Sequence, residues 1–188
     1  MIRAFLITTT FIYFLYPEPK EKYIPKVYDF EGIIEKDFQQ NLKEYKETRI
    51  KIKEYIKSIL TYRYKDDLAD DYANAIYFYS KQYDVDLKVL LALIRTESTF
   101  NPKAVSKFGA KGSCQVMFSI WGDELISNNI IEKEDDLFDI YKGIEAGCYV
   151  LNHYYQKTGC IKLALARYFG ICDYSKIYVD TVLNRSRI

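Results

Sequence analysis

The sequence predicts a mainly α-helical protein. Apolar residues recur at spacings of three and four through most of the chain, and alternating apolar and polar runs are scarce. With 188 residues and 49% hydrophobic content, the chain can bury a proper core. The net charge of +1 provides no bulk electrostatic argument for a nucleic-acid partner.

The first 32 residues predict a targeting segment followed by a linker. Arg3 precedes an apolar run over residues 4–16, which as a helix would span about 20 Å, less than the roughly 30 Å of a bilayer core. Residues 1–16 are therefore expected to be a signal peptide or a short membrane anchor, with membrane association through residues 4–16. A buried N-terminal segment is the alternative. Prolines at 17, 19 and 25 indicate a linker over residues 17–32.

Residues 33–65 predict a long charged amphipathic helix. Its apolar stripe has alternating spacings of four and three, and Arg49 interrupts it near the middle. The interruption argues against a coiled-coil dimer. We expect a helix laid against the following domain or a stalk at a membrane, with self-association as a further alternative.

Residues 66–188 predict one helical domain. Asp67 is a candidate cap for its first helix, and Asp86 is a candidate N-cap for the second. Further helices are expected over residues 119–128, 140–156, 161–169 and 174–183, with an acidic surface connection at 132–136. Gly159 is expected to end the helix over residues 140–156 in the usual left-handed conformation.

The second helix of this domain delivers one carboxylate, Glu97, to its C-terminal end. The run from Val89 to Ile94 is wholly apolar, and the helix is expected to end near 96–98, before the break at Pro102. Burial and the negative end of the helix dipole both disfavour a charged carboxylate there. The pKa of Glu97 is therefore expected to be raised, as a general acid requires. A solvated Glu at a fraying helix end is the alternative.

The residues after Glu97 resemble the catalytic region of the lytic transglycosylases related to goose-type lysozyme. The string TESTFNP at 96–102 is followed by AVSKFGAKG at 104–112 and then by Gln115 and Met117. These match the family's Glu-Ser pair, its S-x-x-G-A-x-G segment and its Q-x-M segment. The resemblance covers roughly residues 67–184. It implies a lysozyme-like fold, with a small β-ribbon around residues 107–116.

The chain departs from the family's pattern at several positions around this region. The family's leucine-methionine before the glutamine is Ser113-Cys114, and its asparagine after the motif tyrosine is Phe169. Phe118 replaces a proline, and Gly143 replaces an asparagine. The acid itself is unaffected.

The resemblance implies a reaction that needs a single carboxylate. Glu97 would protonate the glycosidic oxygen between N-acetylmuramic acid and N-acetylglucosamine, and the muramic C6 hydroxyl would then attack C1 to close a 1,6-anhydro ring. The resemblance also implies substrate-contact residues, which are Ser98, Ser106, Gln115, Met117, Tyr168 and Tyr178. It implies peptidoglycan glycan strands as the partner, no metal or other cofactor, and export to the periplasm or cell envelope. The sequence does not choose among secretion, conjugation and phage machinery as a setting.

Two other functions stay open. A goose-type hydrolase would need a second carboxylate, for which Asp123, Glu124 and Asp173 are candidates. A wall-binding or assembly protein that kept the fold without catalysis is the other.

The cysteines leave the redox state open. Cys114, Cys148, Cys160 and Cys172 could pair in an exported protein or remain buried thiols, and their spacing matches no zinc template. The single histidine, His153, lacks a companion for a metal site or a triad.

Overall fold

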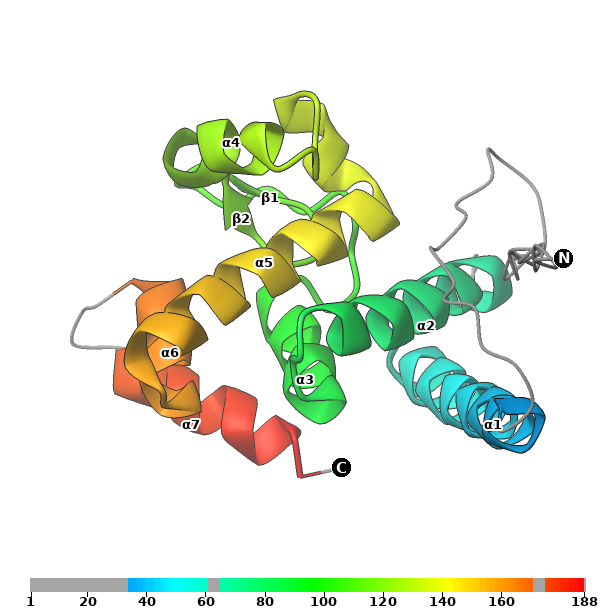
Figure 1. The fold of residues 1–188 in the computed structure, drawn as a ribbon. Helices are drawn as coiled ribbons and strands as arrows, with labels where there is room; N and C mark the ends of the chain where they lie inside the picture. The colour runs from blue at the N-terminus through cyan, green and yellow to red at the C-terminus, as the bar shows by residue number, and fades with distance from the viewer. Residues whose placement is uncertain (1–33, 61–64, 171–174, 188) are drawn as a thin grey trace, which may run out of the picture. The chain divides into compact units, whose positions relative to one another are not determined.

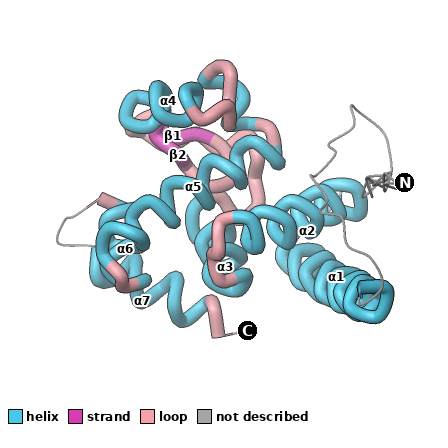
Figure 2. The backbone as a smooth tube through the Cα atoms, viewed as in Figure 1, coloured by secondary structure: helices cyan, strands magenta, loops and turns pink. Residues whose placement is uncertain are grey.

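The computed structural model describes residues 34–60, 65–170 and 175–187. The chain divides into two units, Met1–Glu47 and Thr48–Ile188. The expected targeting segment at 1–16 and the linker at 17–32 lie outside the described residues. Helices dominate the described part, as Figure 2 shows, so the mainly α prediction is confirmed. Among the described helices, none has an apolar stretch long enough to cross a bilayer.

The elements follow one another as labelled in Figure 1. The helices are α1 (Ile34–Ile59), α2 (Lys65–Gln82), α3 (Leu87–Glu97), α4 (Phe118–Ser127), the 3₁₀ helix η1 (Glu134–Phe138), α5 (Ile140–Thr158), α6 (Ile161–Phe169) and α7 (Ser175–Arg185). A two-stranded antiparallel ribbon, β1 (Ala110–Lys111) and β2 (Val116–Met117), pairs Ala110 with Met117. It overlaps the range of 107–116 that the resemblance implied for a ribbon and extends one residue beyond it, to Met117.

Some boundaries differ from the sequence prediction. The helix expected over 33–65 is α1, which ends at Ile59, and α2 already begins at Lys65. Asp67 therefore lies in the first turn of α2 instead of capping it, a position where a negative charge interacts favourably with the helix dipole. The acidic connection predicted at 132–136 contains the start of η1, and α5 extends to Thr158 before the left-handed Gly159.

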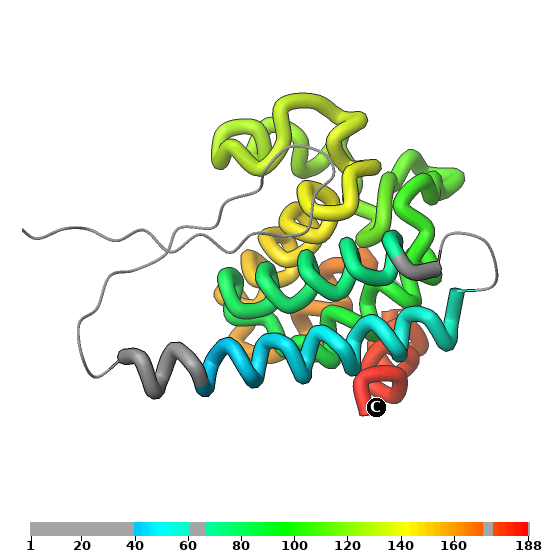
Figure 3. Tube along the Cα trace, turned by 90° about the vertical axis from the view of Figure 1, so that its right-hand side faces the viewer, coloured from blue at the N-terminus to red at the C-terminus, as the bar shows by residue number. Residues whose placement is uncertain are grey.

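Within the second unit, the last part of α1 packs against α2. Ile52 and Ile56 of α1 belong to the hydrophobic core. Arg49 and Lys53 bind opposite oxygens of the Asp70 carboxylate on α2, at 2.7 Å and 2.6 Å. Figure 3 shows residues 48–59 running beside α2. The residue that interrupts the apolar stripe therefore forms an ion pair with the neighbouring helix.

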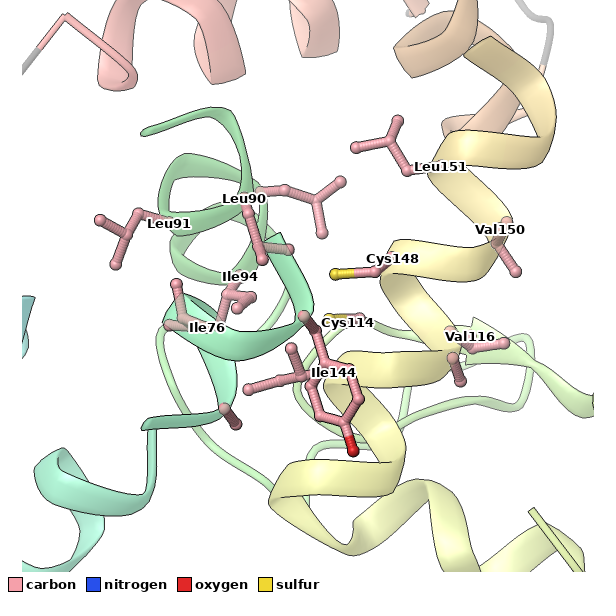
Figure 4. Packing of buried hydrophobic residues seen from close by; sticks show 14 of the residues in the cluster. Ile76, Leu90, Leu91, Ile94, Cys114, Val116, Ile144, Cys148, Val150 and Leu151 are labelled. Carbon is pink, nitrogen blue, oxygen red and sulfur yellow. The ribbon is translucent and has the colours of Figure 1, made fainter. Parts of the chain in front are cut away.

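Helix α5 is the central element of the second unit. It contacts α2, α6, η1 and β2. Figure 4 shows its Ile144 and Cys148 beside Leu90 and Ile94 of α3 in the core. All the residues from Val89 to Ile94 of α3 are buried. The core therefore fixes α3 firmly, and with it the residue at its C-terminal end.

We predict that truncating Ile56 destabilises the protein far more than truncating Ile50. Ile56 is fully buried, whereas Ile50, on the same helix, is 60% exposed. Ile56→Ala should lower the free energy of unfolding by about 2–5 kcal/mol, because it removes buried methyl groups and leaves a cavity. Ile50→Ala should change it by less than about 0.5 kcal/mol. Urea denaturation followed by circular dichroism measures both, and equal effects would contradict the packing of α1 on α2.

Candidate active site

Helix α3 begins at a well-formed cap and ends at Glu97. The Asp86 carboxylate accepts hydrogen bonds from the backbone N–H groups of Lys88 and Val89, at 2.9 Å and 3.0 Å. This confirms Asp86 as the N-cap. Since the run that follows is buried, the helix cannot shift along its axis without exposing apolar surface. The position of Glu97 is therefore set by the packing of the turns before it.

The chain turns sharply directly after Glu97. Ser98 caps the helix, and Thr99 and Phe100 adopt the left-handed conformation with φ of 52° and 60°. Residues other than glycine rarely do so, since Cβ then crowds the backbone. Phe100 is fully buried and meets Tyr72 edge-to-face, with 5.4 Å between the ring centroids. Burial of the Phe100 ring offsets the cost of this turn and directs the following loop away from the end of α3.

The Glu97 carboxyl group is partly buried and has one tyrosine partner from the far end of the chain. The Tyr178 hydroxyl of α7 donates a hydrogen bond to Glu97 Oε1. Burial raises the pKa of Glu97 to about 7, and the hydrogen bond from Tyr178 acts in the opposite direction. The side chain still has partial access to solvent. A carboxyl group with this pKa can give or accept a proton near neutral pH.

Tyr168 and Cys114 pack behind this carboxyl group. The Tyr168 hydroxyl donates a hydrogen bond of 2.7 Å to the Cys114 carbonyl oxygen. A Cβ atom at Gly147 would lie 2.5 Å from Cys114 Sγ, so only glycine leaves room for this side chain. Burial, with the nearby Glu97 charge, raises the pKa of the Cys114 thiol. The thiol is therefore protonated at neutral pH, and this disfavours Cys114 as a nucleophile.

The glycine-containing loop over residues 104–115 is held in its conformation by hydrogen bonds from one of its own side chains. Gln115 Nε2 donates to the carbonyl oxygens of Ala104 and Gly112, at 3.1 Å and 3.0 Å. Gly112 has a φ of 76°, and a Cβ atom there would lie 1.9 Å from the Leu137 carbonyl oxygen. This glycine of the S-x-x-G-A-x-G segment therefore allows the loop to approach the chain before α5 closely.

Ser106 and Ser98, two further predicted contact residues, form hydrogen bonds with backbone groups of their own turns. Ser106 Oγ accepts from the backbone N–H groups of Phe108 and Ala110, at 3.2 Å and 3.0 Å. Ser98 Oγ donates to the Ile94 carbonyl oxygen at 3.2 Å. Met117 lies in β2, directly before α4. Of the seven predicted site residues, the structure joins Glu97 and Tyr178 directly, and it places Tyr168 behind them.

The sequence analysis noted Phe169 as a departure from the family pattern without assigning it to the site. Its ring stacks on that of Tyr178, with centroids 4.5 Å apart and planes 18° apart. The only hint in the sequence was its position directly after Tyr168. The contact joins the end of α6 to α7, so the local pattern could not reveal it.

The described residues contain no group of three or more His, Cys, Asp or Glu side chains that could hold a metal ion. Cys114, Cys148 and Cys160 are free thiols, and Cys172 lies outside the described residues. His153 Nδ1 lies 3.4 Å from Glu124 Oε1, within a cluster of aromatic rings that includes Trp121.

The family model described as the transglycosylase SLT domain matches residues 74–171, slightly more than half of the chain. The chain belongs to this family. The resemblance seen in the sequence is thereby confirmed.

Two curated relatives are both called membrane-bound lytic murein transglycosylase C. The protein from Edwardsiella ictaluri is 38% identical over 85 residues, and the one from Salmonella arizonae is 34% identical over the same length. Each match covers 44% of this chain and 24% of the relative. The chain therefore spans only about a quarter of the length of these relatives.

Solved structures of similar fold include the 70-kDa soluble lytic transglycosylase of Escherichia coli, and a complex of the 70-kDa soluble lytic transglycosylase with bulgecin A. Each is 22% identical, has a TM-score of 0.50, and matches 64% of this chain and 21% of the other. At this identity the likeness shows the fold alone. It confirms the lysozyme-like architecture.

We predict that Tyr178→Phe raises the pKa of Glu97 above about 7. The hydroxyl group stabilises the charged carboxylate, so its removal favours the protonated form, while the phenyl ring preserves the packing. Titration of a ¹³C-labelled Glu97 carboxyl group by NMR measures the change. A pKa that stays constant or falls in the variant would show that the hydrogen bond does not stabilise the carboxylate.

We also predict that Glu97→Gln changes the pH dependence of stability. Because the folded-state pKa of Glu97 is raised from 4.5 to about 7, the folded protein binds more protons than the unfolded chain between these values. This contribution to stability is present below pH 4.5 and is lost as the pH rises to 7. The variant should therefore gain on the order of 2 kcal/mol relative to the parent across that window. Urea denaturation from pH 4.5 to 8 tests this, and a constant difference would contradict the raised pKa.

Proposed function

We propose that the protein is a peptidoglycan lytic transglycosylase that cleaves the β-1,4 bond from N-acetylmuramic acid to N-acetylglucosamine and forms 1,6-anhydro-N-acetylmuramic acid. The observation that carries this proposal is the partly buried Glu97 at the end of α3, with its pKa raised to about 7 and its hydrogen bond from Tyr178. Family membership and the names of the curated relatives support the same activity.

In the proposed reaction Glu97 acts twice. The protonated carboxyl group first donates its proton to the glycosidic oxygen, and the bond to C1 breaks as positive charge develops there. The resulting carboxylate then accepts the proton of the muramic C6 hydroxyl, whose oxygen bonds to C1. Glu97 ends protonated, as it began, and no water is consumed. A pKa near 7 suits a group that serves as acid and then as base at neutral pH.

Tyr178 and Tyr168 support this carboxyl group from one side. The Tyr178 hydroxyl orients the Glu97 carboxylate after the first proton transfer, when the negative charge is present. Tyr168 fixes the backbone at Cys114, directly before Gln115. With Ser98, Ser106, Gln115 and Met117, these tyrosines are proposed to contact the glycan. The hydrogen bonds of Gln115 and Ser106 within the loop would keep its shape constant as the substrate binds.

We further propose that the protein acts in the cell envelope, where peptidoglycan is found. The relatives named as membrane-bound murein transglycosylases support this location. Residues 1–16 would direct the export or the anchoring of the chain. Secretion, conjugation and phage machinery stay open as settings.

We predict that Glu97→Gln lowers the rate of glycan cleavage by roughly 10²–10⁴-fold, because the amide can neither donate nor accept the proton. Activity of the parent should fall as the pH rises above about 7, where Glu97 loses its proton in the free protein. Purified peptidoglycan is digested with each variant, and the released muropeptides are analysed by mass spectrometry. The parent should release 1,6-anhydro ends.

The controls for this experiment separate the proposal from its alternatives. Glu132→Gln changes an exposed carboxylate and should leave the rate unchanged. Glu124 accepts a 2.7 Å hydrogen bond from Tyr149, and Glu124→Gln tests the second carboxylate of a hydrolase. Reducing ends in place of anhydro ends would indicate a hydrolase. Undiminished cleavage by Glu97→Gln would contradict the assignment of Glu97, and an inactive parent that still binds glycan would indicate a wall-binding protein.

A further inference from the structure

Phe169 is an exposed aromatic residue next to Tyr178, the residue that binds the proposed catalytic acid Glu97. It ends α6, and the residue as a whole is 43% exposed. Tyr178, on which this ring stacks, donates the hydrogen bond to Glu97. Tyr178 thus connects an exposed aromatic ring on α6 to the carboxyl group at the end of α3.

The stacking geometry determines which side of the ring is open. With the planes 18° apart and the centroids 4.5 Å apart, Tyr178 covers one face of Phe169. Tyr178 itself is buried. The exposed area of Phe169 therefore belongs to its opposite face and its edge. The contact also restricts the rotation of the ring, so little conformational entropy would be lost when a ligand covers that face.

The chemistry of this surface suits a sugar ring. A phenyl group has no hydrogen-bond donor or acceptor, so it cannot replace the amide that the family pattern has at this position. A pyranose ring presents a face of C–H groups, which packs well on a flat aromatic surface. We propose that the open face of Phe169 stacks on a sugar ring of the glycan strand held at Glu97. This inference rests on the proposed function and adds a contact residue to the same site.

The test measures binding without catalysis. The Glu97→Gln variant of the full chain serves as the background, and peptide-free glycan oligomers of alternating N-acetylglucosamine and N-acetylmuramic acid serve as the probe in isothermal titration calorimetry. Adding Phe169→Ala should weaken binding about tenfold, because the stacked surface is lost. Phe169→Trp, which keeps a flat apolar face, should stay within about threefold of the background.

A matched control and a second measurement separate a direct contact from a structural effect. Tyr155→Ala removes an aromatic side chain of similar exposure, 39%, and should leave binding unchanged. The pKa of Glu97, measured by NMR in Phe169→Ala with Glu97 intact, should stay within about half a unit of the parent if the ring contacts the glycan.

The possible outcomes lead to different conclusions. Unchanged binding by Phe169→Ala, equal losses in the Ala and Trp variants, or a large change in the Glu97 pKa would each overturn the proposed contact. None of these would affect the proposed function. If the Glu97→Gln background binds no glycan at all, the proposed function itself is contradicted.

Discussion

The hydrogen bond from Tyr178 to Glu97 joins two residues that are 81 positions apart in the sequence, and the pKa of Glu97 depends on it. Helix α3 supplies the carboxyl group and α7 supplies the hydroxyl group, so both helices must pack in register for the bond to form. Burial raises the pKa of Glu97, whereas the hydrogen bond from the hydroxyl group lowers it. The pKa of about 7 is therefore a balance between burial of the α3 end and its contact with α7.

This balance has a cost in stability. A carboxyl group that loses its proton in a partly buried position weakens the fold as the pH rises through its pKa. The buried run from Val89 to Ile94 offsets the cost by anchoring α3 in the core. The buried Phe100 ring does the same for the turn that follows, where Thr99 and Phe100 have positive φ. Apolar burial on both sides thus holds in place a residue whose ionisation opposes folding.

Local patterns in the sequence predicted most helices well. Apolar periodicity located α6 over Ile161–Phe169, and the capping roles of Asp86 and Gly159 were evident from residue type alone. Contacts between distant segments could not be predicted in this way. The ion pair of Arg49 with Asp70 and the stacking of Phe169 on Tyr178 depend on how helices pack together. Tyr178 was included in the site through the family resemblance, because no local spacing relates it to Glu97.

Ser113 and Cys114 depart from the family pattern, and both side chains pack well beside the site. The Ser113 hydroxyl group is buried and lies 2.6 Å from that of Tyr72, so each satisfies the other. Leaving either one unpaired would cost about 1–3 kcal/mol. Beside Ser113, the Cys114 side chain fills the space that Gly147 leaves open. These substitutions therefore act on the packing of the loop against α2 and α5. Because the Cys114 carbonyl oxygen accepts a hydrogen bond from Tyr168, the changed side chains leave this contact between the loop and α6 in place.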